Sequence, residues 1–362
     1  MDFSLTEEQE LLKHMVERFN AERGADEREV DPARWAMLAE LGLLALPFAA
    51  EQGGFGGDPV DTITAMEALG RGYAPEPVLV ELYLGGRMLA LAGGDVSGVI
   101  AGEGRYGLAL AEPASRYRFD QVATQAREQG GAWRLTGEKC FVLGAATSGY
   151  IVSASSGGGM GLYLVAADAE GLARTDYRLL DGSQAADLVL RDVAAARLAG
   201  GFDLIDPVLD GARLAAAAEM IGVMGRMFDD TLDYLRTRQQ FGVAIGSFQA
   251  IQHRMADQYA ALEQSRSLLY RAALIEGGER AAAITAASAY VGAAAIRLAE
   301  ECVQLHGGMG VSDELAVGQG LKRVLVLANL FGHPDDTLAR YAAITSSQAD
   351  AMPAVRPVAM RA

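Results

Sequence analysis

The sequence is poor in cysteine and histidine, and it lacks a long uninterrupted run of apolar residues. Among its 362 residues there are two cysteines, Cys140 and Cys302, and four histidines. Two cysteines cannot build a disulfide framework, and neither residue type has the spacing of a zinc site. A membrane-spanning helix needs roughly 18 to 20 apolar residues, and we find no run of that length. We therefore expect a protein without a metal ion, a disulfide framework or a membrane span.

Positive charge is also scarce, because 31 Lys and Arg residues stand against 47 Asp and Glu residues, a net charge of −16. A surface this acidic repels nucleic acid and anionic lipid, so we expect neither as a partner. The first ten residues are rich in acids and have no apolar segment typical of a secretory signal, which predicts a cytoplasmic location. Hydrophobic residues make up 51% of the chain, enough for a large core in two or three domains.

The pattern of apolar residues divides the chain into three parts and predicts an α+β fold. Residues 1–105 have helical periodicity, with a capping box at residues 6–9. Residues 106–203 contain short apolar runs between Gly-rich turns, which favour a small antiparallel barrel or sandwich of about 90 residues. Residues 204–362 are helical again and predict an antiparallel bundle of the four-helix type. Three long Ala-rich stretches carry that bundle, at residues 206–236, 248–276 and 281–305.

Common nucleotide-binding and hydrolase motifs are absent. The chain contains no Gly-x-Ser-x-Gly, no Walker motif and no Rossmann glycine pattern between a strand and a helix. Two less common motifs remain, RTRQQFG at residues 236–242 and QLHGGMG at residues 304–310.

Each of these motifs has a structural and a functional interpretation. The arginines of the first motif lie near a helix end, where they stabilise the helix dipole and Gly242 can be the C′ glycine. Alternatively, Arg238 offers its guanidinium to an anion while Gln240 and Phe241 hold the ligand. The second motif is either a helix end with a flexible loop or a glycine backbone that approaches a flat ligand closely. His306 within it fits a structural role better than a catalytic one.

These motifs, with FQAIQ at residues 248–252 between them, resemble the acyl-CoA dehydrogenase family. The resemblance covers nearly the whole chain, because residues 51–57 resemble the family's N-terminal domain, and residues 112–113 and 137–139 resemble landmarks of its β domain. It implies a helical domain, a β-barrel and a helical bundle, usually in a tetramer. It also implies an FAD cofactor, oxidation of an acyl-CoA between Cα and Cβ, and an electron-transfer flavoprotein as acceptor. Such enzymes serve fatty acid or steroid side-chain catabolism.

In this family, the β domain of one subunit holds the flavin ring of FAD, and a neighbour's bundle holds the adenosine and pyrophosphate. The residues that match this second half are Arg238, Gln240, Phe241, Phe248, Gln249, Gln304, Leu305, His306, Gly307 and Gly308. Arg213 matches an arginine near the acyl-CoA site of relatives. Lys322 and Arg323 are further candidates for binding the anionic CoA.

The flavin-ring half and the catalytic base do not match. Ala111 and Leu143 stand where relatives have hydroxyl side chains that hydrogen-bond the flavin ring. In relatives a Glu removes the α-proton, and it comes either from a Tyr-Glu-Gly-Thr motif or from the first bundle helix. Phe331 and Ala212 occupy these two positions, and neither side chain can accept a proton.

Three residues are candidates for a relocated base. Glu219 lies seven residues after Ala212, two turns along the same helical face. His333 is two residues from the vacant position and carries an imidazole, which suits proton transfer near neutral pH. Glu314 follows the Gly-rich loop, where relatives have a structural Glu. We expect each of the three to be structural rather than catalytic.

The absence of the flavin-ring hydroxyl groups and of the catalytic Glu predicts a specific role for this chain. From its first nine residues onward, the chain resembles the small, base-lacking subunits of heteromeric pimeloyl-type and steroid side-chain acyl-CoA dehydrogenases. It would then supply the adenosine and pyrophosphate half of the FAD site to a Glu-bearing partner chain in a heterotetramer. Three alternatives stay open: a homo-oligomeric dehydrogenase with a relocated base, another flavin-dependent reaction such as an oxidase or monooxygenase, and a flavin-free interaction protein. The sequence does not specify the acyl group.

Overall fold

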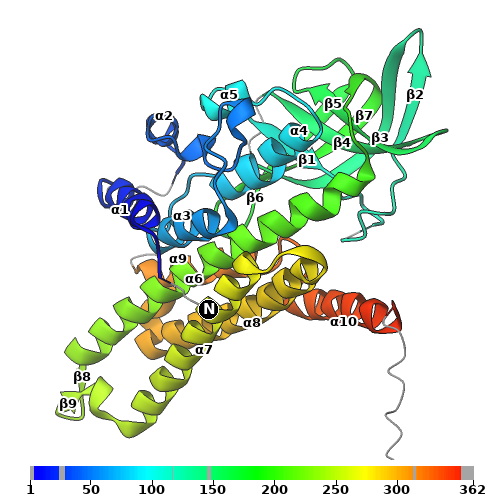
Figure 1. The fold of residues 1–362 in the computed structure, drawn as a ribbon. Coiled ribbons are helices and arrows are strands. Elements are labelled where there is room, and N and C mark those ends of the chain that lie inside the picture. The colour runs from blue at the N-terminus through cyan, green and yellow to red at the C-terminus, as the bar shows by residue number, and fades with distance from the viewer. Residues whose placement is uncertain (1–3, 24–28, 116, 145–147, 313–314, 352–362) are drawn as a thin grey trace, which may run out of the picture.

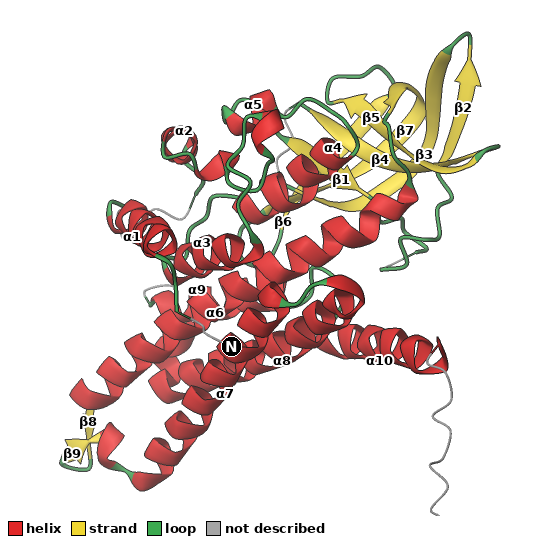
Figure 2. Ribbon diagram, in the orientation of Figure 1, coloured by secondary structure: helices red, strands yellow, loops and turns green. Residues whose placement is uncertain are grey.

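The computed structural model describes residues 4–351 except 24–28, 116, 145–147 and 313–314. The chain forms a helical layer, a β-barrel and a long helical bundle, in that order along the sequence (Figures 1 and 2). The predicted α+β architecture is therefore confirmed. Glu314, one of the candidate bases, lies outside the described residues.

The first helices begin where polar caps satisfy their first amide groups. Thr6 and Gln9 form the predicted capping box of α1, and Asp31 caps α2. Residues 1–105 are predicted to be helical, but one segment of this layer, η3, is a π-helix rather than an α-helix. Nearly every side chain of η3 is buried, so apolar periodicity cannot reveal its wider turn. The helices of this layer are α1 (Glu7–Ala21), α2 (Pro32–Glu40), η1 (Leu43–Ala45), η2 (Ala50–Gln52), α3 (Pro59–Arg71), η3 (Leu79–Gly86), α4 (Arg87–Leu91) and α5 (Ser97–Ile100).

Seven strands form the barrel, and β4 closes it by pairing with both β2 and β5. The sequence predicts antiparallel pairing throughout, but β1 runs parallel to β4. A parallel pair needs a long connection, which the intervening β2–β3 hairpin provides. The strands are β1 (Tyr106–Ala109), β2 (Gln125–Gln129), β3 (Ala132–Leu143), β4 (Gly149–Ser156), β5 (Gly159–Ala166), β6 (Leu172–Arg178) and β7 (Gln184–Arg197).

The bundle is built from the three predicted Ala-rich helices, which begin and end within two residues of the predicted positions. The longest of them, α6, runs diagonally through the molecule and also packs against the helical layer (Figure 1). Many of its buried positions are Ala or Gly, which lets neighbouring helices approach closely. The helices of the bundle are α6 (Ile205–Thr237), α7 (Gln249–Leu274), α8 (Arg280–His306), α9 (Ala316–Leu327) and α10 (Pro334–Ala351).

One helical segment is strongly apolar overall, although polar residues interrupt its apolar runs. Gly277–Val311, which contains α8, is long and apolar enough to cross a membrane by composition alone, with a mean hydropathy of 1.4. In the structure, 61% of its most apolar window is buried inside the protein. Such burial is typical of the core helix of a bundle.

The helical layer and the bundle meet where α3 crosses α6. A Cβ atom at Gly222 would lie 2.0 Å from the carbonyl oxygen of Glu67. A Cβ atom at Gly70 would lie 2.1 Å from the carbonyl oxygen of Glu219. No side chain fits at these separations, so the two helix backbones are in direct contact and only glycine is tolerated at both positions.

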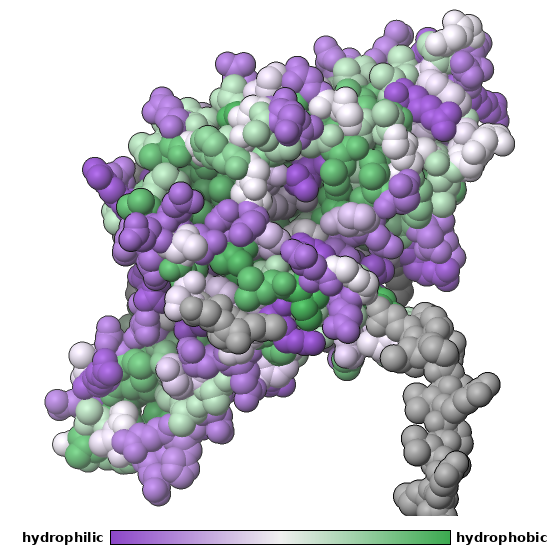
Figure 3. All heavy atoms as spheres, viewed as in Figure 1, coloured by the Kyte–Doolittle hydropathy of each residue, from purple (hydrophilic) through white to green (hydrophobic). Residues whose placement is uncertain are grey.

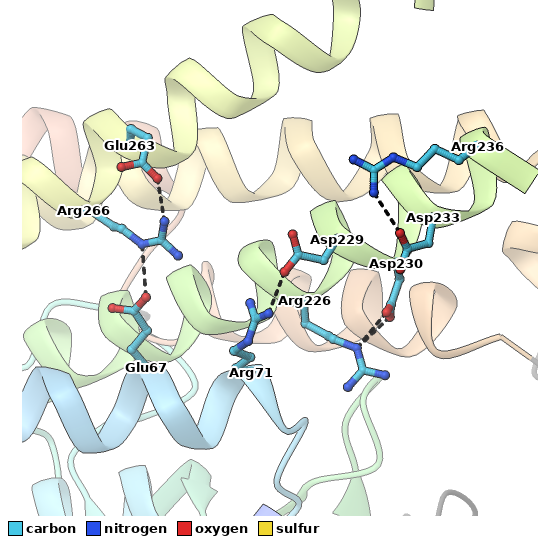
Figure 4. Close-up of polar contacts among 9 residues, drawn as sticks. All are labelled: Glu67, Arg71, Arg226, Asp229, Asp230, Asp233, Arg236, Glu263 and Arg266. Carbon is cyan, nitrogen blue, oxygen red and sulfur yellow. Dashed lines mark hydrogen bonds and ion pairs between the residues drawn. The ribbon is translucent and has the colours of Figure 1, made fainter. Parts of the chain in front are cut away.

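Ion pairs flank this crossing and extend it to α7 (Figure 4). Arg266 on α7 pairs with Glu67 on α3, with 3.1 Å between Nε and Oε1, and also with Glu263 on its own helix. Arg71 on α3 pairs with Asp229 on α6, with 2.6 Å between Nη2 and Oδ2. These pairs are partly exposed, so each contributes only about 0–1 kcal/mol. The glycine contact, rather than the ion pairs, therefore sets the separation of the helices.

We predict that Gly222→Ala lowers the free energy of unfolding by about 1–3 kcal/mol, because the new methyl group forces α3 and α6 apart. Gly211→Ala on the same helix is the matched control, since a Cβ atom there meets nothing within 4 Å. The control should gain about 0.5–1 kcal/mol, because alanine stabilises a helix relative to glycine. Denaturant unfolding followed by circular dichroism measures both. Equal effects of the two substitutions would contradict a direct backbone contact.

Candidate functional site

The two motifs singled out in the sequence lie at the same end of the bundle. Helices α6 and α8 run in the same direction, and the ring of Tyr234 on α6 stacks on His306 of α8 with 4.4 Å between centroids. The first motif therefore follows the end of α6, the second follows the end of α8, and α7 begins beside them. We call this end of the bundle the tip.

At the tip, the first motif forms a tight hairpin rather than a glycine helix cap. Helix α6 ends at Thr237, and Arg238 is its C-cap with an extended backbone. The two-residue strands β8 (Gln239–Gln240) and β9 (Val243–Ala244) pair across a turn at Phe241 and Gly242. Both turn residues have positive φ, 55° and 82°, as a type I′ turn requires. The interpretation of Gly242 as a C′ glycine is therefore wrong.

This hairpin presents apolar rings and a positive charge to solvent. Phe241 is 92% exposed although its left-handed backbone is costly for a residue with a Cβ. Its ring meets Phe248 edge-on at 6.2 Å. Arg238 is exposed, and among the described residues no carboxylate pairs with it. Strain and exposure of this kind are common at binding surfaces.

The second motif lies beside this hairpin with its backbone open. Gly307 has a φ of 63°, and a Cβ atom at Gly307 or Gly308 would meet nothing within 4 Å. His306 is buried, and its Nδ1 lies 2.8 Å from the Cys302 carbonyl oxygen. It therefore has a structural role at the end of α8, where the glycine loop begins. Leu305 is also buried, whereas Gln304 is exposed.

Eight of the ten predicted cofactor residues are thus exposed at the tip: Arg238, Gln240, Phe241, Phe248, Gln249, Gln304, Gly307 and Gly308. Figure 3 shows apolar and polar surface mixed at this end of the molecule. A guanidinium without a carboxylate partner fits a pyrophosphate, and exposed rings beside open glycines fit a flat heterocycle. The tip therefore has the donors and surfaces that the adenosine and pyrophosphate part of FAD requires.

The barrel holds the positions expected to contact the flavin ring. Leu143 ends β3, and Phe141 two residues before it has a φ of 55° at a break in the β3–β7 register. The Phe141 amide donates to Asp187 Oδ1 at 3.0 Å, which holds this strained conformation in place. Neither Ala111 nor Leu143 has a hydroxyl group. Any flavin ring bound here would therefore lack two of the hydrogen bonds expected in relatives.

A buried ion pair fixes the segment next to Ala111. Lys139 Nζ lies 2.7 Å from Glu112 Oε1 and 3.0 Å from Ser153 Oγ, inside the barrel. Burial acts to raise the pKa of Glu112, but the bonds from Lys139 and Thr124 outweigh it and hold the pKa below its ordinary value. The two landmarks that the sequence indicated, residues 112–113 and 137–139, therefore meet in one structural network.

The two positions where relatives have the catalytic base lie close together. They are occupied by Ala212 and Phe331, and neither side chain can act as a base. Ala212 is fully buried, and the guanidinium of its neighbour Arg213 lies 5.8 Å from the ring centroid of Phe331. Arg213 Nη1 pairs with Asp210 Oδ1 at 2.7 Å. His333 points to the surface, with 52% of its side chain exposed, and pairs with Asp335 at 3.4 Å.

Glu219, the remaining candidate, is occupied by a buried ion pair. Arg323 on α9 donates from Nε to Glu219 Oε1 at 2.7 Å and from Nη1 to Asp181 Oδ2 at 2.7 Å. Burial raises the pKa of Glu219, and the guanidinium of Arg323 opposes that rise. The ion pairs of Arg323 with Glu219 and Asp181 therefore connect α6, α9 and the turn before β7. From the sequence, Arg323 is a candidate for binding CoA and Asp181 has no indicated role, because the two partners of Arg323 are distant from it in the chain.

A cleft of about 910 Å³ lies between the helical layer, the barrel and α9. The residues that line it include Leu143, Leu330 (the neighbour of Phe331), Asp181 and Arg323. The cleft thus adjoins both the flavin-ring position and the vacant base position. The tip of the bundle does not contribute to it.

Comparisons with known proteins identify the family and the fold. Residues 6–95 match the family model described as acyl-CoA dehydrogenase, N-terminal domain, and residues 199–338 match acyl-CoA dehydrogenase, C-terminal domain. The probable acyl-CoA dehydrogenase YngJ of Bacillus subtilis is 30% identical over 355 residues, covering 89% of this chain and 93% of that protein. The caffeyl-CoA reductase-Etf complex subunit CarC of Acetobacterium woodii is 28% identical and covers 77% and 80%. A chain of the ChsE4-ChsE5 complex from Mycobacterium tuberculosis superposes with a TM-score of 0.85 at 26% identity, covering 98% and 100%.

We predict that Glu219→Gln lowers the free energy of unfolding by about 1–3 kcal/mol, because Arg323 then loses one of its two carboxylate partners in a buried setting. His333→Gln is the control and should change stability by less than about 0.5 kcal/mol, since its side chain is exposed. Thermal and denaturant unfolding measure both. A Glu219→Gln protein as stable as the wild type would argue against a structural role for this carboxylate.

Proposed function

The chain belongs to the acyl-CoA dehydrogenase family, and we propose that it acts there as the base-lacking subunit of a heteromeric, FAD-dependent acyl-CoA dehydrogenase. Members of the family are FAD flavoproteins that oxidise acyl-CoA in fatty acid or steroid catabolism. The observation that carries the proposal is the contrast between the two ends of α6. Near its start, Phe331 and Ala212 stand at the positions of the base, whereas past its end the tip exposes most of the residues predicted to bind the cofactor.

The residues of the tip would hold the adenosine and pyrophosphate of FAD. The guanidinium of Arg238 would donate charge-assisted hydrogen bonds to the pyrophosphate, and the rings of Phe241 and Phe248 would cover apolar surface of the cofactor. When bound, FAD supplies the acceptor for the hydride that leaves Cβ of the acyl-CoA. The chain's own contribution is to bind and orient the cofactor for a second chain.

Among the residues that the structure describes, none offers a group that suits removal of the α-proton at this chain's own base position. Arg213 is cationic and paired with Asp210, and Phe331 is a hydrocarbon ring. Glu219 is engaged by Arg323, and His333 lies on the surface. A positioned proton acceptor within hydrogen-bond reach is what general base catalysis needs. The proposal therefore assigns the base to a partner chain with Glu at the position matched by Phe331.

Two relatives support an assembly of this kind. The ChsE4-ChsE5 complex contains two different chains, and CarC belongs to a complex with an electron-transfer flavoprotein. We infer a heterotetramer in the cytoplasm that passes electrons to such a flavoprotein. Because the surface of this chain is acidic, the anionic CoA needs positively charged residues at its binding site. Arg213 and Lys322 are candidates.

The first test is the visible spectrum of the purified chain, alone and co-purified with a family chain that carries Glu at the position of Phe331. We expect the chain alone to be colourless, and the complex to be yellow and bleached by acyl-CoA under anaerobic conditions. A chain that is yellow and bleached by acyl-CoA on its own would overturn the subunit role in favour of a homomeric enzyme. A complex that never binds flavin would favour an interaction protein.

We predict that Arg238→Ala weakens FAD binding to the complex by about 10- to 100-fold, because a charge-assisted hydrogen bond contributes about 1.5–3 kcal/mol. Arg236→Ala is the matched control, since Arg236 is equally exposed but pairs with Asp233 on its own helix. Titration of the apo-complex with FAD, followed by flavin fluorescence, measures both. Unchanged FAD affinity in Arg238→Ala would remove the tip from the cofactor site.

A further inference from the structure

The hairpin formed by β2 and β3 carries two arginines directly opposite each other. Arg127 on β2 pairs in register with Arg134 on β3, so both side chains project from the same face of the hairpin. Like charges in this arrangement repel and destabilise a hairpin. The hairpin lies at the opposite end of the molecule from β8 and β9 (Figure 1). The repulsion is therefore a property of a surface that the FAD half-site does not use.

A third arginine lies close to this pair. Arg134 Nη1 donates to the Asp192 carbonyl oxygen at 3.0 Å, so its guanidinium reaches from β3 to the neighbouring strand β7. At this point β7 bulges, and Arg191, the residue before Asp192, is exposed there. We call Arg127, Arg134 and Arg191 the arginine face. Together they spread positive charge across three adjacent strands.

The charges of the arginine face are not balanced within the chain. Among the described residues, no carboxylate forms an ion pair with any of the three, and Asp192 accepts from Arg134 through its carbonyl oxygen. By contrast, Arg174 on the same barrel pairs with Asp176. The chain has 47 acidic residues against 31 basic ones, so carboxylates are in excess. Guanidinium groups that stay unpaired in such a chain are available to an acidic partner.

The neighbours of the arginine face are small or polar. In register with the two arginines, the same face of the hairpin and of β7 exposes Gln125, Gln129, Ala132, Thr136 and Ala194. Trp133 belongs to the opposite face, where its ring packs 5.2 Å from the ring of Tyr163. Short side chains allow a polypeptide backbone to lie close to the strands. The same face has no ring on which the bases of a nucleic acid could stack.

We propose that the arginine face docks an acidic segment of another protein. Adjacent strands lie about 4.8 Å apart, and side chains on one face of an extended peptide repeat about every 7 Å. Glutamates at alternate positions therefore reach neighbouring guanidinium groups, which bind carboxylates through paired hydrogen bonds. The net charge of −16 repels a long polyanion, so a short acidic segment fits this local patch better than nucleic acid. Neither the tip nor the cleft includes these residues, and the inference therefore goes beyond the proposed function.

A fluorescein-labelled peptide of four Glu-Thr repeats tests this surface on the flavin-free chain. Fluorescence anisotropy should show saturable binding, and added salt should weaken it, because exposed charges are screened. A peptide of four Lys-Thr repeats has the same length and the opposite charge. It should not bind.

Replacing the opposing pair by Arg127→Gln with Arg134→Gln should weaken binding of the Glu-Thr peptide about tenfold or more. Arg271→Gln with Arg297→Gln is the matched control, since it removes two exposed arginines from the bundle and should bind normally. Arg127→Glu with Arg134→Glu should reverse the preference, so that the Lys-Thr peptide binds and the Glu-Thr peptide does not.

Thermal unfolding followed by circular dichroism shows whether each variant is folded. The midpoint of the Gln double variant should be unchanged or higher, because a repulsion is removed. A lower midpoint would show that the pair is stabilised within the chain and would overturn the proposal. So would absent or charge-independent peptide binding, or equal weakening in the bundle control. Tighter binding of single-stranded DNA of the same charge would overturn it in favour of a nucleic-acid site. None of these results depends on flavin, so they are independent of the test of the shared FAD site.

Discussion

The direct contact between the backbones of α3 and α6 determines where the functional surfaces of this chain lie. Gly70 and Gly222 allow the contact, and any side chain at either position would enter the space of the opposite carbonyl group. Through it, α6 is attached to the helical layer near its middle and reaches the base positions at one end and the tip at the other. The cleft is lined by residues of the helical layer and of α9, which packs against α6. Its shape therefore depends on two residues that do not line it.

Local patterns in the sequence were sufficient to predict the long helices and to single out the two motifs that lie together at the tip. The capping box at Thr6 and the three Ala-rich helices depend on neighbours a few residues apart, so periodicity reveals them. The ion pairs of Arg323 were beyond such reasoning, because its partners Glu219 and Asp181 are 104 and 142 residues away. The Gly242 error has a similar origin. A glycine after a helix has the same sequence signature as a cap and as a hairpin turn, and only the pairing of β8 with β9 distinguishes them.

The charged groups near the two ends of α6 differ in whether they have partners within the chain. Around Arg213 and Phe331, the buried charge of Arg213 is paired with Asp210 within the chain, and the Arg213 guanidinium lies over the Phe331 ring. At the tip, Arg238 faces solvent with no carboxylate partner among the described residues, and the rings of Phe241 and Phe248 are exposed near it. A surface with an unpaired charge and exposed rings is stabilised when a ligand or another chain covers it. The division agrees with a protein that completes a site elsewhere rather than within itself.

The exposure of Phe241 has a consequence for how such a chain is produced. A ring that is 92% exposed on a strained turn is harmless while another molecule covers it. Molecules made in excess of their partner would leave these rings uncovered, and uncovered apolar patches associate with one another. The amount of this chain in the cell must therefore be matched to the amount of whatever covers the tip. A gene for such a chain is best placed under the same control as the gene for its partner.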